Sequence, residues 1–219
     1  MRKYDAVLFD LDGTVLDTSV GILKSIRETI KEFNLKELSE DELKTFIGPP
    51  VEWSFNDKYG LEGDELKAVV MCFRDRYSNH NLLDAIPYEG IYELLGYFKE
   101  KGIRTAIATY KKQDYATKLL CEFGFDKYFD YMYGSDYEGK LKKADIINLC
   151  IESLNTTNDR VLMVGDSKHD ANGAKAIGVD FAGVSFGFGF GSQDDINDFD
   201  HVIYVDKALE LKSLFEEEE

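Results

Sequence analysis

The pattern of apolar and polar residues divides the chain into two regions of different secondary structure. Val7-Leu8-Phe9 is a short apolar run, typical of a buried strand, and it stops at Asp10. From residue 17 to about residue 85 the apolar residues instead recur at intervals of three and four, which favours helices. One such helix face comprises Ile22, Ile26, Ile30 and Phe33.

Local signals set the bounds of the helices in this region. Ser39, with Glu42 three residues later, is the signature of a capping box, which marks a helix start. Gly48-Pro49-Pro50 ends that helix, and two more helices are expected over residues 51–59 and 65–77. No convincing strand pattern interrupts the region. We therefore interpret it as a separate helical unit inserted early in the chain.

After Pro87 the pattern alternates between helix and strand. A helix is expected from Ile91 to Gly102, and a second one follows the next strand and ends at Phe123. Two more helices are expected over residues 144–154 and 171–177. Strands are expected over residues 103–108, 131–133, 160–164, 179–184 and 202–205. Strands that alternate with helices form parallel sheets with helices on both faces. The sequence therefore predicts an α/β fold.

Composition indicates which partners the protein can bind and in which compartment it works. The 219 residues include 42 acidic and 26 basic ones, and the formal net charge of −16 opposes binding to nucleic acid or to an anionic membrane surface. No apolar stretch approaches the roughly 18 residues that span a bilayer, and the first five residues are not those of a signal peptide. The three cysteines lack CxxC spacing, which indicates reduced thiols and a cytoplasmic location. Oligomeric state is left open.

Polar residues gather where three of the predicted strands end. Asp10 and Asp12 follow the first strand, Thr109-Tyr110-Lys111 follows the strand at 103–108, and Asp166 with Asp170 follows the strand at 160–164. A parallel sheet brings such ends to one edge, so the four carboxylates should lie close together. They would repel one another unless a cation neutralised them. Oxygen ligands without His or Cys select a hard ion, so Mg²⁺ is the expected cofactor.

The same segments resemble the signature motifs of the haloacid dehalogenase superfamily. Asp10-Leu11-Asp12-Gly13-Thr14-Val15 is similar to its first motif, DxDGT followed by a hydrophobic residue. Thr109 matches the second motif, and Gly165-Asp166-Ser167 with Asp170 matches the fourth, GDSxxD. The third motif is a lysine, for which Lys143 is the preferred candidate and Lys140 and Lys142 are alternatives. The Gly48-Pro49-Pro50 turn is similar to one in the phosphoglycolate-phosphatase-like branch.

This resemblance implies a fold and an activity. Residues 1–16 and 86–219 would form a Rossmann-like parallel-sheet core, and residues 17–85 an inserted α-helical cap domain. The protein would be a phosphatase that acts on a small phosphorylated metabolite. Phosphoglycolate, nucleotides, sugar phosphates and pyrophosphate are all left open as substrates.

The resemblance also implies roles for individual residues. Asp10 would attack phosphorus and form an aspartyl-phosphate, while Asp12 would act as the general acid and base. Asp10, Asp166 and the backbone carbonyl of Asp12 would bind Mg²⁺, with Asp170 beside them as a further ligand or as a partner of Lys143. Three residues would bind the substrate phosphate: Thr109, Tyr110 and Lys143. Tyr110 departs from the family pattern, which commonly has Asn at this position.

Two other functions compete with the phosphatase interpretation. A β-phosphoglucomutase-like enzyme usually has a histidine and an arginine where this chain has Ile22 and the Gly48-Pro49-Pro50 turn. A non-catalytic phosphate-binding regulatory protein would be expected to lack Asp10, Asp12 or Asp166, and all three are present. The segment Gly187-Phe188-Gly189-Phe190-Gly191-Ser192 has GxGxG spacing, which is not a dinucleotide-binding fingerprint. It is expected to be a loop that flanks the active site.

Overall fold

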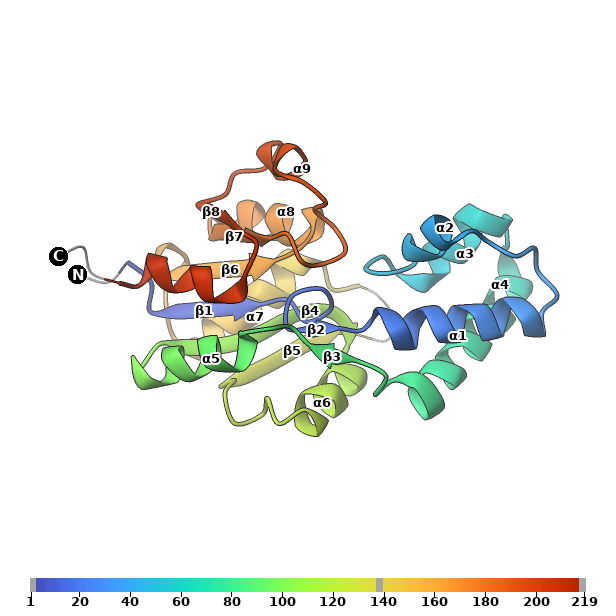
Figure 1. Cartoon of the computed structure of the whole chain (residues 1–219), viewed down its shortest axis with the longest axis horizontal. Coiled ribbons are helices and arrows are strands. Elements are labelled where there is room, and N and C mark those ends of the chain that lie inside the picture. Colours follow the sequence, from blue (N-terminus) through green and yellow to red (C-terminus); the bar gives the residue numbers. More distant parts are fainter. Residues whose placement is uncertain (1–2, 137–139, 217–219) are drawn as a thin grey trace. The chain divides into compact units, whose positions relative to one another are not determined.

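A computed structural model describes residues 3–136 and 140–216 of the chain (Figure 1). The chain divides into two compact units. One unit contains Met1–Asp17 and Pro87–Glu219, and the other is Thr18–Ile86. The short strands β2 (Leu16–Asp17) and β3 (Ile86–Pro87) pair with each other where the chain passes from one unit to the other. Among the described residues, no helix combines the length and the apolar character needed to cross a membrane.

The first unit is built on a six-stranded parallel sheet. Its strand order is β5-β4-β1-β6-β7-β8, and each neighbouring pair runs parallel. The strands are β1 (Ala6–Phe9), β4 (Arg104–Lys112), β5 (Tyr131–Ser135), β6 (Val161–Gly165), β7 (Asp180–Val184) and β8 (Ile203–Val205). The predicted α/β fold with a parallel sheet is therefore confirmed. β1 lies in the middle of the sheet, between β4 and β6, so its carboxyl end is flanked on both sides.

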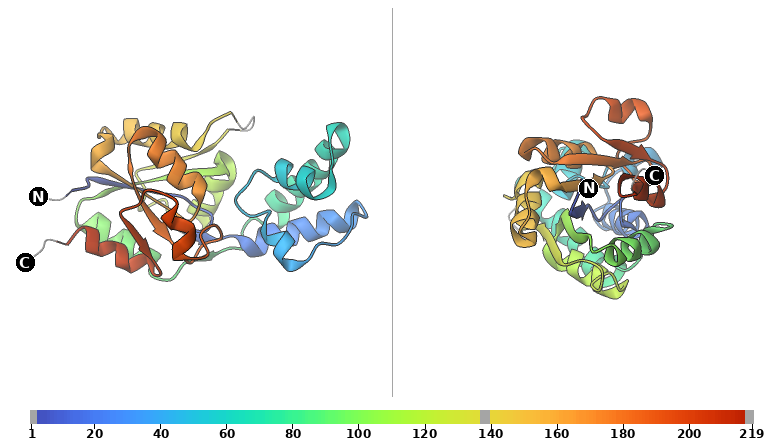
Figure 2. Two further views of the ribbon diagram at one scale, coloured as in Figure 1. Left: turned by 90° about the horizontal axis from the view of Figure 1, so that it is seen from above. Right: turned by 90° about the vertical axis from the view of Figure 1, so that its left-hand side faces the viewer.

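Helices cover both faces of this sheet (Figure 2). The helices of the unit are α5 (Ile91–Glu100), α6 (Gln113–Glu122), α7 (Lys143–Leu154), α8 (Lys168–Ile177) and α9 (Gln193–Asn197), with 3₁₀ turns η2 (Asn158–Arg160) and η3 (Ala208–Leu214). Helices α7 and α8 pack against each other on one face, whereas α5 packs against η3 on the other. Some strand connections step across the sheet toward β5 and others step toward β8, in the opposite direction. Because parallel connections are right-handed, the helices of these two groups lie on opposite faces of the sheet.

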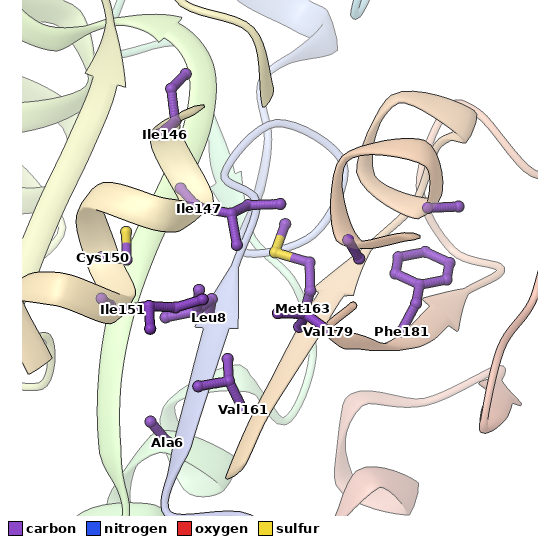
Figure 3. Packing of buried hydrophobic residues seen from close by; sticks show 14 of the residues in the cluster. Ala6, Leu8, Ile146, Ile147, Cys150, Ile151, Val161, Met163, Val179 and Phe181 are labelled. Carbon is purple, nitrogen blue, oxygen red and sulfur yellow. The ribbon is translucent and has the colours of Figure 1, made fainter. Parts of the chain in front are cut away.

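Apolar side chains from α7 and from the central strands form the core beneath α7 and α8. Figure 3 shows Ala6 and Leu8 of β1 beside Val161 and Met163 of β6, with Ile147 and Ile151 of α7 near them. The strand residues in this set are fully buried. Burying one side chain of this size contributes about 1.5–3 kcal/mol, so this cluster fixes α7 firmly on the sheet. Lys143, the first residue of α7, is positioned by the same packing.

The second unit is helical, as its spacing of apolar residues predicts. It contains α1 (Ser19–Glu32), α2 (Glu40–Lys44), α3 (Val51–Tyr59), α4 (Gly63–Arg76) and a π-helical turn η1 (Tyr77–Asn81). The capping box is confirmed, because Glu42 N donates to Ser39 Oγ and Ser39 N donates to the Glu42 carboxylate. Gly21 of α1 approaches η1 closely, and Asn81 of η1 donates to Ser25 Oγ at 3.0 Å inside the unit.

The structure differs from the sequence prediction at several element ends. β4 runs to Lys112, four residues beyond the predicted end, because a bulge between Ala108 and Lys112 lets pairing with β5 continue. α8 begins at Lys168 instead of residue 171, because Ser167 and Asp170 form a capping box at its start. The short elements α9 and η3 were not predicted, since neither has a long enough periodic pattern to be read.

Candidate active site

Asp10 lies at the carboxyl end of the central strand. Its backbone N–H donates to the carbonyl of Val164 at 2.9 Å, which extends the β1–β6 ladder by one residue. Phe9 pairs with Ile107 on one side and with Val164 on the other. This register places Asp10 beside the segments that carry Thr109 and Asp166. The Asp10 side chain is buried although it is polar.

Three predicted site carboxylates meet at this edge of the sheet. Oxygens of Asp10, Asp166 and Asp170 all lie within 4.8 Å of one another, and all three residues are buried. Burial raises the pKa of Asp10 to about 6, although the neighbouring Lys143 ammonium opposes the shift. Burial, together with the charges of Asp170 and Asp10, raises the pKa of Asp166 to about 8. The cluster therefore holds more negative charge than its protein surroundings compensate.

Lys143 provides positive charge inside the cluster. Its Nζ lies 2.6 Å from Asp10 Oδ1 and 2.6 Å from Asp170 Oδ1. Burial by itself would lower the pKa of the Lys143 ammonium, but the charges of Asp10 and Asp170 outweigh burial and raise it. Lys140 and Lys142 are exposed, so Lys143 is the member of this lysine run that the fold brings into the cluster.

The donor set fits a hard divalent cation. Three carboxylates face the one Lys143 ammonium, which leaves an excess of negative charge. Asp170 Oδ1 is buried, and it shares the Lys143 ammonium with Asp10 Oδ1, each 2.6 Å from Nζ. Oxygen ligands from carboxyl groups that outnumber the neighbouring ammonium group are what Mg²⁺ and similar ions prefer. The cluster of Asp10, Asp166 and Asp170 could therefore hold a divalent cation.

Asp12 and Lys111 form a second ion pair at the same edge. Lys111 Nζ donates to both carboxylate oxygens of Asp12, at 2.9 and 3.1 Å. The Lys111 side chain is only 5% exposed, so this pair is largely shielded from water. In the sequence, Lys111 stands at a predicted strand end, where no role was expected for it. A buried lysine directly beside the candidate acid and base is the main site residue that the sequence pattern did not reveal.

The bulge in β4 turns three consecutive residues toward different partners. Thr109 is buried, and its Oγ1 accepts a hydrogen bond from the backbone N–H of Lys111 at 3.1 Å. The Tyr110 hydroxyl accepts a hydrogen bond from the backbone N–H of Lys143 at 2.8 Å, and Lys143 Nζ lies 5.6 Å from the centre of the Tyr110 ring. The predicted phosphate contact of Tyr110 stays a prediction, but its hydroxyl is bonded to the start of α7.

The glycine-rich segment after β7 lies against Asp166. The backbone N–H groups of Phe188 and Gly189 both donate to Asp166 Oδ2, at 2.6 and 3.2 Å. The sequence predicts a loop beside the active site here, but local patterning gives no reason to connect it with Asp166. Gly187 and Gly189 are explained by how closely the backbone approaches Asp166 at these two positions.

Comparisons with known proteins agree with this geometry. A family model described as haloacid dehalogenase-like hydrolase matches residues 7–184. A 5'-nucleotidase of Pseudomonas aeruginosa is 32% identical over 215 residues, which cover 98% of this chain and 96% of that protein. The pyrophosphatase PpaX of Halalkalibacterium halodurans is 31% identical over 90% of each chain. The structure of a haloacid dehalogenase-like hydrolase from Streptococcus pneumoniae superposes with a TM-score of 0.90 at 28% identity, covering 99% of this chain and 100% of that one.

The matched region runs from the first strand to the end of β7 and includes every residue of the carboxylate cluster. The buried aspartates that meet at the carboxyl edge of the parallel sheet are residues of the sequence motifs. The chain therefore belongs to the haloacid dehalogenase-like hydrolase family, and it is an enzyme of the phosphatase type.

Proposed function

We propose that this protein is a Mg²⁺-dependent phosphatase that hydrolyses a small phosphate monoester through an aspartyl-phosphate at Asp10. The observation that carries this proposal is the contact between Asp10 and Lys143 inside the carboxylate cluster, with Nζ and Oδ1 2.6 Å apart. A carboxylate can attack a phosphate dianion only where positive charge offsets the repulsion. Lys143 supplies one such charge next to the attacking group.

In the first step, a carboxylate oxygen of Asp10 attacks phosphorus and the bond from phosphorus to the leaving oxygen breaks. Asp12 donates a proton to that oxygen, so that it leaves as a neutral hydroxyl group. In the second step, Asp12 removes a proton from a water molecule, which attacks the phosphorus of the aspartyl-phosphate. Inorganic phosphate is released and the Asp10 carboxylate is restored. Lys111 holds both oxygens of the Asp12 carboxylate, which orients the group as the base of the second step.

The remaining residues would bind the phosphoryl group and the cation. Thr109 and Lys143 are proposed to donate to phosphoryl oxygens, where charge develops in the transition state. Asp10, Asp166 and the Asp12 carbonyl are proposed to hold Mg²⁺, with Asp170 beside them. When bound, the ion neutralises negative charge on the phosphoryl oxygens and fixes their orientation. Asp10 could then approach the phosphorus without prohibitive repulsion.

The substrate is proposed to be a small phosphorylated metabolite. Two of the similar proteins are named as a 5'-nucleotidase and as a pyrophosphatase, so nucleotides and pyrophosphate are candidates together with phosphoglycolate. We also propose that the helical unit Thr18–Ile86 is the cap that the family resemblance implies. All three cysteines are free, which supports the proposed cytoplasmic site of action.

Hydrolysis of p-nitrophenyl phosphate with and without Mg²⁺ tests the proposal. The wild-type protein should be active with Mg²⁺ and inactive in excess EDTA, and Asp10→Asn should remove activity. Asp194→Asn changes an exposed aspartate of α9 and should leave activity unchanged. Acid quenching during turnover, followed by mass spectrometry, should find a phosphoryl group on the peptide that contains Asp10. Inactivity of the wild-type protein with Mg²⁺ toward a broad panel of phosphate esters would refute the proposal.

A further inference from the structure

The loop of residues 187–190, called here the 187–190 loop, directs three consecutive amides to a single aspartate. Phe188 N and Gly189 N donate to Asp166 Oδ2, at 2.6 and 3.2 Å. Phe190 N donates to the backbone carbonyl of Asp166 at 2.8 Å. Both the side chain and the main chain of Asp166 are therefore held by one short segment that lies more than twenty residues further along the chain.

The glycines of this loop are required by how closely it approaches Asp166. A Cβ on Gly187 would lie 2.3 Å from Asp166 Cβ and 2.4 Å from the carbonyl oxygen of Gly13. A Cβ on Gly189 would lie 2.5 Å from the Asp166 carbonyl oxygen. These distances are too short for any real side chain. The first two glycines of the GxGxG segment are thus explained by packing around Asp166, without a nucleotide.

The loop is anchored behind its contact with Asp166. The Phe190 side chain is buried, and its ring packs against Phe181 and Phe199 with centroids 6.3 and 5.6 Å away. Tyr204 of β8 donates a hydrogen bond from its hydroxyl to the Phe190 carbonyl at 3.2 Å. The two amides that donate to the Asp166 side chain are therefore fixed by the sheet and its core, so they can hold the carboxylate in one orientation.

The hydrogen bonds use only one oxygen of Asp166. Oδ2 accepts both amides, whereas Oδ1 accepts no hydrogen bond from the residues that the structure describes. Asp166 also contributes to the cluster in which carboxylate oxygens of Asp10, Asp166 and Asp170 lie within 4.8 Å. A carboxylate with one oxygen fixed by two donors and the other oxygen available is well prepared to bind a cation.

We propose, on the basis of the function proposed above, that the 187–190 loop is a positioning element for the divalent cation. Its amides hold Asp166 Oδ2, which presents Oδ1 of the same carboxylate to the ion. The residues of the loop do not touch the substrate or the ion in this proposal. They act through Asp166, so their loss should weaken cation binding first and activity only as a consequence.

The test compares two alanine substitutions in the same segment. Gly187→Ala should displace Asp166, whereas Gly191→Ala places its Cβ 3.5 Å from Asp195 Oδ2, an ordinary contact, and serves as the control. Mg²⁺ binding is measured by calorimetry on the full chain. Gly187→Ala should raise the Kd for Mg²⁺ by about 10- to 100-fold, as is typical when a partner of a metal ligand is lost. Gly191→Ala should keep the wild-type Kd within about twofold, and excess Mg²⁺ should restore part of the phosphatase activity of Gly187→Ala.

A measurement on the wild-type protein decides the matter if Gly187→Ala fails to fold. In ¹H–¹⁵N spectra, the amide resonances of Phe188 and Gly189 should shift during a Mg²⁺ titration, with the Kd found by calorimetry, and that of Gly191 should shift much less. A folded Gly187→Ala with unchanged Kd, or Phe188 and Gly189 resonances that do not respond, would overturn the inference while leaving the phosphatase proposal intact. A wild-type protein that binds no Mg²⁺ would overturn both.

Discussion

Lys111 and Asp12 form a bidentate ion pair in which Nζ lies 2.9 and 3.1 Å from the two carboxylate oxygens. The two residues are 99 positions apart in the sequence and meet because β4 continues past Ala108 through a bulge. A pair with a 5% exposed lysine is shielded from solvent, so it can orient its carboxylate more firmly than a surface pair. Asp12 is therefore held in place before any substrate binds.

Lys111→Met should lower kcat by about 10- to 100-fold. A positioned general acid or base accelerates the reaction by about 10²–10⁴-fold, and loss of its orientation should remove part of that acceleration. The methionine keeps the apolar stem and removes the charge that orients Asp12. Turnover of p-nitrophenyl phosphate at saturating Mg²⁺ measures the effect. Lys118→Met, at an exposed position of α6, should have wild-type kcat. If Lys111→Met also kept wild-type kcat, Lys111 would have no part in orienting Asp12.

The sequence reveals the strand ends but not the contacts between them. Asp10 and Asp166 could be found because each follows a continuous apolar run, and such runs predict buried strands that end where polar residues begin. Lys143 could only be preferred over Lys140 and Lys142, since three nearby lysines look alike in sequence. Burial under the packing of α7 distinguishes it, and burial is decided by the whole fold.

Lys111 and the 187–190 loop were missed for a common physical reason. Local periodicity reports which face of an element is apolar, but it carries no information about partners distant in sequence. The bulge between Ala108 and Lys112 is set by pairing with β5, and the approach of Gly187 to Asp166 is set by the parallel pairing of β6 with β7. Both depend on contacts that form only in the assembled sheet.

Gly21→Ala should destabilise the helical unit by about 1–3 kcal/mol, because adding a methyl group to a packed site strains the backbone. The new Cβ would lie 2.1 Å from the carbonyl oxygen of Asn81, which belongs to the main chain of η1 and cannot rotate away. Urea unfolding monitored by circular dichroism measures the loss.

Gly96→Ala gives the matched control with the opposite sign. Gly96 lies inside α5 and a Cβ there would meet nothing within 4 Å. Since alanine favours helix over glycine by about 0.5–1 kcal/mol, this variant should be more stable than the wild-type protein. Equal effects of the two substitutions would show that the close approach at Gly21 is not a constraint on folding.

Asp180→Asn should lower stability at neutral pH and lose its effect in acid. Tyr4, which is buried, donates from its hydroxyl to Asp180 Oδ2 at 2.7 Å, and Lys3 pairs with the same oxygen at 2.7 Å. Burial would raise the pKa of Asp180, but the hydrogen bonds from Lys3 and Tyr4 outweigh it and lower the pKa. A carboxyl with a lowered pKa in the folded state contributes stability above its unfolded pKa, and loses it as pH falls through the folded one.

The stability difference between wild-type protein and Asp180→Asn should therefore be present at pH 7, and it should disappear as the pH falls below 3.8, the ordinary pKa of an aspartate. We expect less than about 1 kcal/mol at pH 7, because Lys3 and Asp180 are partly exposed and water screens the pair. Thermal unfolding across pH 2 to 7 measures it. Asp200→Asn is the control. Asp200 pairs with Lys175 and is more exposed than Asp180, so its substitution should change stability less at every pH. A difference that grew on acidification would contradict the assignment.

Tyr110→Phe should weaken phosphate binding by less than about tenfold, because one neutral hydrogen bond contributes about 0.5–1.5 kcal/mol. The substitution removes the hydroxyl that accepts from Lys143 N at 2.8 Å but keeps the ring near Nζ. The start of α7 would be held less firmly, and Lys143 with it. The inhibition constant of inorganic phosphate measures binding, and it should rise.

A hydroxyl that bound the substrate phosphate directly would give a different result from one that holds the start of α7. Loss of a direct contact would leave the stability of the free protein unchanged, whereas loss of the bond to Lys143 N should lower it by about 0.5–1.5 kcal/mol, measured by urea unfolding without phosphate. Tyr133→Phe is the matched control, because the Tyr133 hydroxyl bonds Ser153 Oγ at 2.8 Å, further along α7. It should also lower stability, but the inhibition constant of phosphate should not change. Weaker inhibition by phosphate in Tyr110→Phe at wild-type stability would make Tyr110 a phosphate ligand, as the sequence predicted.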